Sequence, residues 1–463
     1  MQILKVKLQN VSPYHAQNDT RICYVLEFIS TFYGIRVEPS PEGLTLPTPQ
    51  FDSWTPNNIR VTYIDTIPVL YTDQQPTHII STTGHVGFDL IGATFFLLSL
   101  SEELKFHTPR FRSSLSLLHK FDLLRTPLIN LWLIQIEHHL RTKGYHLPPR
   151  WPTGDFAIVL THDIDRLGTV EFTLRGKLRR IMLLNTMKHL TLRTLLHSVG
   201  APLHYLLRKA LGMYSPTIVN PDIGDWITCE SQYGWRSTFF IFPDKVHLRD
   251  PSDPIYTYHD KTLFHGKPIK LIDLLRELKP THDIGLHASR HSYNNFNTLR
   301  MERRRLSQLI GNIDAVRHHY ISFDAYQSPA TLEAAGFTVD SSLGWPDNVG
   351  FRAAVAYPFK LWDHTRMRST NVWEVPLTLQ ESIAIVHLGL DTPAKLWSLI
   401  DKLIHEASRS TGMLTLLFHP AAIDMPFDTF KFYRELLTRL SHEDAWITTI
   451  SGIKDWLSQR TPQ

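Results

Sequence analysis

Short apolar runs separated by amphipathic stretches organise the second half of the chain. The runs have the length of strands and lie at 156–161, 237–242, 283–287, 336–340, 372–379 and 415–419. Apolar residues at helical spacing occur between them, for example over 299–315 and 430–440. This alternation predicts parallel strands joined by helical crossovers, as in an α/β protein.

The first third of the chain predicts a separate, smaller α/β domain. Its expected elements are a helix over 21–33, a proline-rich stretch over 39–49, strands within 60–71 and an apolar helix over 88–104. Three prolines and a glycine within 145–154 then interrupt the helical periodicity. We therefore expect an N-terminal domain over 1–150 and a second domain over 151–463.

The composition is that of an ordinary globular protein. Of 463 residues, 43% are hydrophobic and 20% charged, which is enough chain for two sizeable cores. The 48 basic and 44 acidic residues are nearly balanced, so no nucleic-acid partner is expected. No apolar run reaches the roughly 18 residues of a membrane span, and the first residues lack the apolar core of a secretory signal. A cytoplasmic location is therefore expected, and the oligomeric state stays open.

The first apolar run ends in two carboxylates, Asp163 and Asp165. Like charges this close are difficult to ionise together unless a cation lies between them. A second run ends in two histidines four residues apart, His287 and His291, a spacing suited to one divalent ion. One carboxylate and two imidazoles leave a coordination position open for water, which is the layout of a hydrolytic site.

Three further segments complete an ordered set of motifs that resembles the polysaccharide deacetylase family, carbohydrate esterase family 4. The motifs read Thr161-His-Asp-Ile-Asp165, Ser237-Thr-Phe-Phe240, His287-Ala-Ser-Arg-His291, Arg317-His-His-Tyr320 and Leu417-Phe-His419. The resemblance covers about residues 155–455. It implies an irregular (β/α) barrel of about seven parallel strands with the active site at their C-terminal ends. Residues 88–99 resemble the N-terminal companion domain of some bacterial deacetylase-like proteins.

The resemblance implies a metal site and a catalytic base. Asp165, His287 and His291 are the expected ligands of one divalent ion, with zinc expected and cobalt, nickel or iron as alternatives. Asp163 is the expected base that takes a proton from water. Because Ile164 separates two aspartates that are usually adjacent, their roles could be exchanged.

Further catalytic roles are implied for four residues. Arg317 would orient the base, the backbone N–H of Tyr320 would help to stabilise an oxyanion, and His419 would protonate the leaving amine. The carboxylate that tunes His419 is expected to be Glu381, with Glu374 as competitor.

Two departures from the family pattern bear on the site. Ala288 replaces the hydroxyl residue that normally steadies the loop with the histidines, and His319 replaces the usual proline.

The function expected from these features is metal-dependent removal of an acyl group, acetyl first of all, from an N-acylated amino sugar or its polymer. A hydrolase of another small amide C–N bond is one alternative. A non-catalytic carbohydrate-binding protein that has kept the fold is another.

A basic, leucine-rich insertion is expected over 166–211. It holds Arg175, Lys177, Arg179, Arg180, Lys188, Arg193, Arg208 and Lys209 against a single acid, Glu171. Such a stretch can lie on an anionic membrane, which would place the enzyme at the inner membrane face. Helices with a solvated basic face are the competing interpretation.

Overall fold

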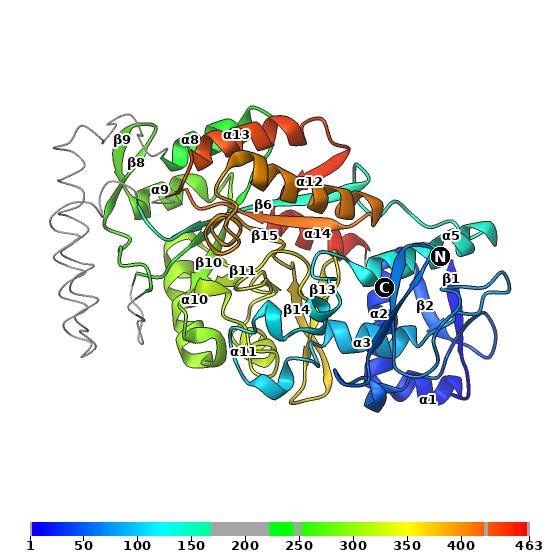
Figure 1. The fold of residues 1–463 in the computed structure, drawn as a ribbon. Helices are drawn as coiled ribbons and strands as arrows, with labels where there is room; N and C mark the ends of the chain where they lie inside the picture. Colours follow the sequence, from blue (N-terminus) through cyan, green and yellow to red (C-terminus); the bar gives the residue numbers. More distant parts are fainter. Residues whose placement is uncertain (1, 168–221, 245–249, 251, 421–424, 461–463) are drawn as a thin grey trace.

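One large, mostly parallel sheet forms the centre of the molecule (Figure 1). The computed structural model describes residues 2–167, 222–244, 250, 252–420 and 425–460. Ten strands make up this sheet in the order β13-β14-β12-β11-β10-β7-β6-β16-β15, with β17 also paired to β6. Only β13 runs antiparallel to its neighbour. The protein is therefore a mixed α/β fold with a curled, half-barrel sheet, and it has more strands than the seven expected.

The strands follow the apolar runs closely. Their bounds are β6 (Phe156–Ile164), β7 (Thr238–Ile241), β10 (Asp283–Ala288), β11 (Ala315–His318), β12 (Val339–Asp340), β13 (Phe359–Asp363), β14 (Arg368–Glu374), β15 (Leu379–Gln380), β16 (Met413–Leu417) and β17 (Ala445–Thr448). Every residue of β6 is buried, because β7, β16 and β17 all pair with it. Each of the six apolar runs overlaps at least one of these strands.

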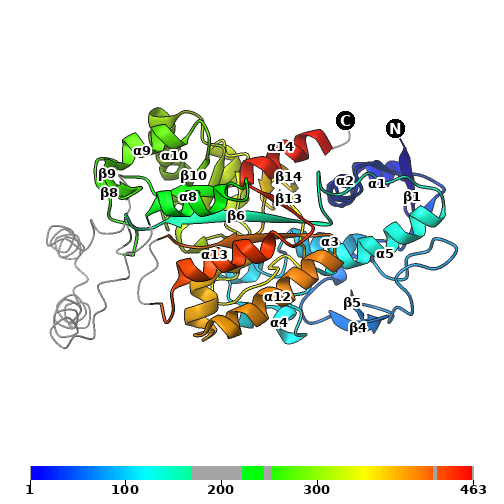
Figure 2. The ribbon, with the colours of Figure 1, turned by 90° about the horizontal axis from the view of Figure 1, so that it is seen from above.

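Helices pack around the sheet (Figures 1 and 2). They are α8 (Ile223–Ser231), α9 (Leu271–Leu278), α10 (Phe296–Ile310), α11 (Ser328–Ala334), α12 (Pro393–Arg409), α13 (Thr429–Leu440) and α14 (Ile450–Arg460). The helix expected over 299–315 ends at Ile310, because Gly311 adopts a positive φ of 87° and the chain then enters β11. A hairpin of β8 (Lys261–Phe264) and β9 (Lys267–Lys270) completes this part.

The N-terminal part contains a three-stranded parallel sheet, a hairpin and four main helices. The elements are β1 (Ile3–Leu8), α1 (Pro13–Asn18), α2 (Thr20–Tyr33), β2 (Arg36–Pro39), β3 (Leu44–Leu46), β4 (Arg60–Ile64), β5 (Ile67–Tyr71), α3 (Leu90–Leu98) and α5 (Leu128–Thr142). The expected helix over 21–33 and the strands within 60–71 are present. The expected helix over 88–104 is shorter, because Leu100 adopts a left-handed φ of 55°.

The two parts share one hydrophobic core that runs from Leu4 to Leu457. Buried polar contacts also join them. Asn130 on α5 donates to the Ala356 and Ser410 carbonyls and accepts from the Ala356 N–H. The boundary near residue 150 stays a prediction, but these contacts show that the N-terminal part is not packed as an independent module.

The C-terminal helix α14 packs against the N-terminal part. Arg460 donates to the carbonyls of Thr31 and Phe32 at 2.9 and 2.8 Å. The two chain ends therefore lie near each other in both ribbon views.

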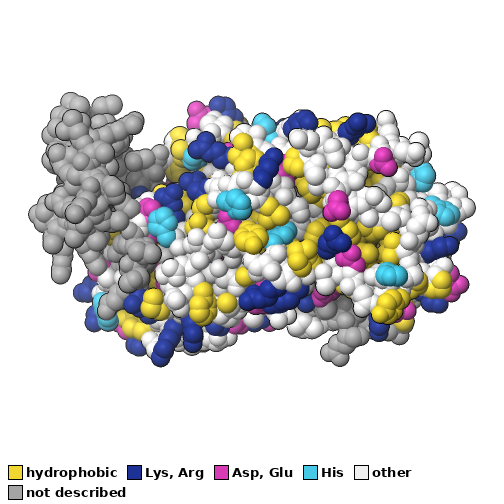
Figure 3. Space-filling model, turned by 90° about the horizontal axis from the view of Figure 1, so that it is seen from below, with side chains coloured by type: hydrophobic (Ala, Val, Ile, Leu, Met, Phe, Trp, Pro, Cys, Tyr) yellow, Lys and Arg dark blue, Asp and Glu magenta, His cyan; other side chains and the backbone are white. Residues whose placement is uncertain are grey.

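The surface is mixed in charge. Figure 3 shows basic side chains scattered among acidic and neutral ones on the face that it draws. The basic residues expected to contact a membrane, from Arg175 to Lys209, lie outside the described residues. None of the described helices is long and apolar enough to cross a membrane.

The shared core predicts that a single α5 side chain stabilises both parts. Replacing Asn130 with alanine removes three hydrogen bonds and leaves the buried Ala356 N–H unpaired, so the free energy of unfolding should fall by about 2–4 kcal/mol. Urea denaturation followed by tryptophan fluorescence measures this loss. Asn18→Ala is the matched control, because Asn18 is exposed and donates only to the Tyr14 carbonyl.

Candidate active site

The C-terminal ends of four strands bring the polar residues of the motifs together. Asp163 and Asp165 lie at the end of β6, His287 on β10, Arg317 on β11 and His419 just after β16. Parallel strands end at the same edge of a sheet, so residues far apart in sequence meet there.

Asp165, His287 and His319 form a cluster whose potential ligand atoms all lie within 4.8 Å of one another. His287 Nε2 lies 3.1 Å and His319 Nε2 lies 3.9 Å from Asp165 Oδ1. The buried His287 Nε2 and Asp165 Oδ1 atoms have no hydrogen-bond partner among the described residues, although they face each other. Buried polar atoms without partners are costly, so this donor set fits a divalent cation.

Backbone and carboxylate contacts orient the two imidazoles. His287 Nδ1 bonds the Arg317 carbonyl at 3.0 Å, which leaves Nε2 to face the cluster. His319 Nδ1 lies 2.8 Å from the buried Asp253 carboxylate, an arrangement typical of metal-binding histidines. In the sequence, His319 stood out only because it replaces the usual proline of the arginine motif. Its position directly after a strand of motif residues was the available signal.

The structure does not bring His291 into the cluster. Its side chain is 51% exposed, and its Nε2 lies 3.0 Å from Asp250 Oδ2. The reason is the turn after β10, where the Arg290 N–H bonds Asp253 and directs the following residue outward. Among the described residues, His319 and not His291 lies together with Asp165 and His287.

Ser289 supplies the loop hydroxyl that Ala288 lacks. Its Oγ donates to Glu302 at 2.5 Å and its backbone N–H donates at 3.1 Å. Burial raises the pKa of Glu302 to about 7, although these two hydrogen bonds oppose the shift. The loop after β10 is therefore steadied from α10 and not from Ala288.

Arg317 and Asp163 form a fully buried ion pair. Arg317 Nη1 donates to Asp163 Oδ1 at 3.0 Å and to Thr161 Oγ1 at 2.8 Å. Its Nε and Nη2 donate to the carbonyl and hydroxyl oxygens of Ser341, and its guanidinium lies over the Phe240 ring. Each guanidinium nitrogen of Arg317 therefore has a hydrogen-bond partner, as a buried charge requires.

His419 pairs with Glu381 and not with Glu374. His419 Nδ1 lies 2.7 Å from Glu381 Oε1, which also accepts the His419 backbone N–H. Burial lowers the pKa of His419, but the Glu381 carboxylate outweighs this effect and raises it to about 10. Glu374 is instead buried beside Asp340 and accepts the Leu343 N–H.

The Asp165 carboxylate is surrounded by imidazoles. His419 Nε2 lies 3.6 Å from Asp165 Oδ2, opposite the side that faces His287 and His319. Burial alone would raise the pKa of Asp165, but charge on His319, His287 and His419 holds it well below its usual range. Asp165 is therefore an ionised carboxylate suited to bind a cation.

Tyr320 follows His319 in a strained turn. Tyr320 and Ile321 have left-handed φ values of 60° and 47°, which are rare for such residues and gather at functional sites. The Tyr320 side chain is 40% exposed, so it borders the cluster from the solvent side. The role expected for its backbone N–H stays a prediction.

A family of unknown function (DUF7033) matches residues 45–145, which include the 88–99 segment. No curated protein matches the chain.

Similar solved structures include two proteins described as polysaccharide deacetylases. The one from Mycobacterium smegmatis is 17% identical with a TM-score of 0.41, and the match covers 68% of this chain and 94% of that one. The one from Pseudomonas aeruginosa PAO1 is 14% identical with a TM-score of 0.38, covering 70% and 99%. The chain resembles polysaccharide deacetylases. Puue allantoinase is also similar, at 14% identity and a TM-score of 0.39, covering 69% and 97%.

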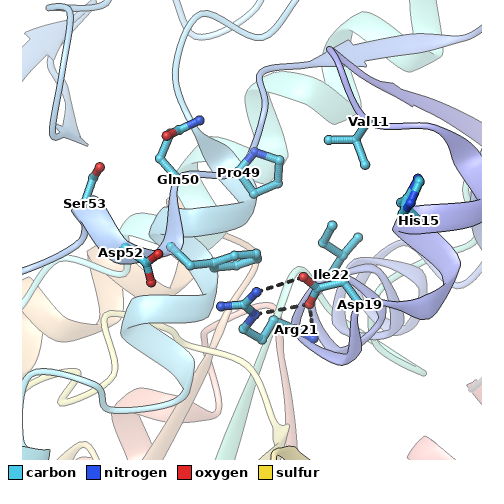
Figure 4. A pocket seen from close by; sticks show the side chains of 10 residues that line it. Val11, His15, Asp19, Arg21, Ile22, Pro49, Gln50, Asp52 and Ser53 are labelled. Carbon is cyan, nitrogen blue, oxygen red and sulfur yellow. Dashed lines mark hydrogen bonds and ion pairs between the residues drawn. The ribbon is translucent and has the colours of Figure 1, made fainter.

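A surface cavity in the N-terminal part is separate from this cluster (Figure 4). It is lined by Val11, His15, Asp19, Arg21, Ile22, Pro49, Gln50, Phe51, Asp52 and Ser53. The Arg21 guanidinium lies over the Phe51 ring and pairs with Asp19, so its charge is already satisfied. The cavity shares no residue with the carboxylate and histidine cluster.

The cluster predicts which histidines hold metal. His287→Ala and His319→Ala should each abolish stoichiometric divalent metal in the purified protein, because each removes one of three protein ligands. His291→Ala should retain it. Metal content by plasma mass spectrometry, with circular dichroism to check folding, measures both. If only His291→Ala lost its metal, the ligand set expected from the sequence, with His291 in place of His319, would be supported.

Buried Glu302 predicts a pH-dependent stability. The pKa of Glu302 is higher in the folded chain than in the unfolded chain, where it is near 4.5. Its stabilisation is therefore full below pH 4.5 and is lost as the pH rises through about 7. The free energy of unfolding in urea should decline between about pH 5 and pH 8, and Glu302→Gln should make this decline smaller by about 1–3 kcal/mol. Glu435→Gln, on the exposed face of α13, should leave the decline unchanged.

Proposed function

We propose that the protein is a metal-dependent amide hydrolase that removes an N-acyl group, acetyl first of all, from an amino sugar or its polymer. The observation that supports this best is the cluster of Asp165, His287 and His319, in which Asp165 Oδ1 and His287 Nε2 have no hydrogen-bond partner within the described part of the chain. Beside it lie two supported acid–base groups, Asp163 and His419. The ordered motifs and the likeness to deacetylases agree with this reaction class.

The residues present fit a divalent ion. Asp165, His287 and His319 would hold it, with zinc expected from one oxygen and two nitrogen donors, and cobalt, nickel or iron as alternatives. When bound there, such an ion supplies Lewis acidity that polarises an amide carbonyl and makes water more acidic.

The remaining steps fall to side chains of the chain itself. Asp163 accepts a proton from the attacking water at its Oδ2, because Arg317 occupies Oδ1. The Tyr320 N–H contributes to stabilising the oxyanion. His419 carries the proton that the departing amine needs, and Glu381 holds its Nδ1 so that Nε2 faces the site.

Two alternatives stay with this proposal. The same groups would also cleave another small amide C–N bond, since no step depends on a sugar ring. A non-catalytic carbohydrate-binding protein would not need the buried Asp163–Arg317 pair next to unpartnered ligand atoms. We further propose a cytoplasmic location, with contact to the inner membrane face depending on residues outside the described part of the chain.

A screen of N-acetylated sugars and small amides, with metal analysis of the same protein, tests the proposal. Asp163→Asn should keep its metal and lose about 10²- to 10⁴-fold in kcat, because an amide cannot accept the proton. Asp165→Asn should lose metal first. The reverse pattern would show that the two aspartates exchange roles, and turnover retained by both variants would rule out this mechanism.

A further inference from the structure

Two arginines from distant parts of the chain meet at one aromatic ring beside the site. The guanidinium carbons of Arg110 and Arg290 lie 5.3 and 5.1 Å from the centre of the Tyr320 ring. Arg110 belongs to the N-terminal part, whereas Arg290 lies in the loop after β10. The Tyr320 ring in turn lies 4.4 Å from the ring of His319. The two positive charges are thus separated from the metal-binding cluster by a single side chain.

Arg110 lacks an acidic partner among the described residues. Among these residues its guanidinium has a single, long hydrogen bond, from Nη2 to the Pro346 carbonyl at 3.4 Å, and its buried Nε has no partner. Burial and the charge of Arg290 lower the pKa of Arg110, although the Asp347 carboxylate opposes this shift. That carboxylate is already bound to the Ser113 N–H at 2.9 Å.

Arg290 is only partly neutralised. Its Nη1 lies 3.3 Å from Asp250 Oδ2. The same oxygen faces His291 Nε2 at 3.0 Å, so one carboxylate is shared between two basic side chains. Asp250 is therefore divided between Arg290 and His291, while Arg110 forms no ion pair among the described residues.

The backbone holds Arg110 in this position. The Phe323 N–H donates to the Pro109 carbonyl at 2.8 Å, three residues beyond Tyr320. The Ser113 N–H contact to Asp347 fixes the other side of the segment. Arg110 is thus anchored to the loops of the candidate active site, and the N-terminal part contributes a side chain to their rim.

We propose that Arg110 and Arg290 form a subsite for an oxyanion, a carboxylate or phosphate carried by the substrate near its scissile amide. A guanidinium offers a planar pair of donors that matches both groups, and an anion bound near both guanidinium groups would relieve their mutual repulsion. The subsite rests on the proposed hydrolase function and narrows it to N-acylated substrates that bear a negative charge. It also gives the N-terminal part a role in recognising substrate.

Binding of inorganic phosphate tests the subsite without turnover. Titration calorimetry on the purified full-length protein should show binding that Arg110→Gln and Arg290→Gln each weaken by about tenfold to a hundredfold. Arg300→Gln is the matched control, because Arg300 lies over the Phe296 ring on exposed α10, and it should bind as the parent protein does. His287→Ala should also keep the binding, which separates this subsite from phosphate held by a metal ion.

Turnover of paired probes then distinguishes the source of the oxyanion. N-acetylglucosamine, its 6-phosphate and N-acetylmuramic acid present no charge, a phosphate and a carboxylate. At least one charged probe should have a lower KM than the neutral sugar, and both arginine variants should raise that KM to the value for the neutral sugar.

The outcomes separate the two proposals. Phosphate binding that is equal in all arginine variants, or a charge preference that survives them, would overturn the subsite even if the neutral sugar is hydrolysed. Arginine-dependent phosphate binding in a protein that hydrolyses no amide would keep the anion subsite and reject the hydrolase function.

Discussion

The buried Asp163–Arg317 pair is the interaction on which the site depends. Two charges taken out of water destabilise a fold unless each finds partners, and here Thr161 and Ser341 complete the set around Arg317. The same residue acts through its backbone, because its carbonyl accepts from His287 Nδ1. One position on β11 therefore orients both the expected base on β6 and a candidate ligand on β10. A shift of β11 would disturb both groups together.

The N-terminal part is a second constraint on the same loops. Glu103 pairs with the buried Arg352 at 2.5 Å, and Tyr24 donates to the Lys360 carbonyl, so both contacts reach the chain between β12 and β14. The Ser341 that holds Arg317 lies at the start of that stretch. The packing of residues before 150 thus supports the geometry of residues after it, which explains why the two parts share one core.

The sequence predicted the local features well and the non-local ones poorly. The apolar runs identified strands such as β6 and β10, and the ordered motifs predicted the observed contacts of Asp163 with Arg317 and of Glu381 with His419. The sequence could not show that His291 lies outside the cluster, because its spacing from His287 carries no information on a turn held by Asp253 and Glu302 from elsewhere in the chain. Similarly, β11 is only four residues long and follows a helix, so periodicity alone could not detect it.

The orientation of three imidazoles favours the binding of a cation in the cluster. The Arg317 carbonyl, Asp253 and Glu381 each bind the Nδ1 of a different histidine, and so each leaves an Nε2 near Asp165. Without a cation, only protonated imidazole rings balance the negative charge of Asp165, and burial disfavours a charged imidazole. A divalent ion removes this conflict, because two rings can then be neutral ligands while His419 alone carries a proton. The position of Nε2 distinguishes the three rings, because those of His287 and His319 lie near Asp165 Oδ1, whereas that of His419 lies near Oδ2.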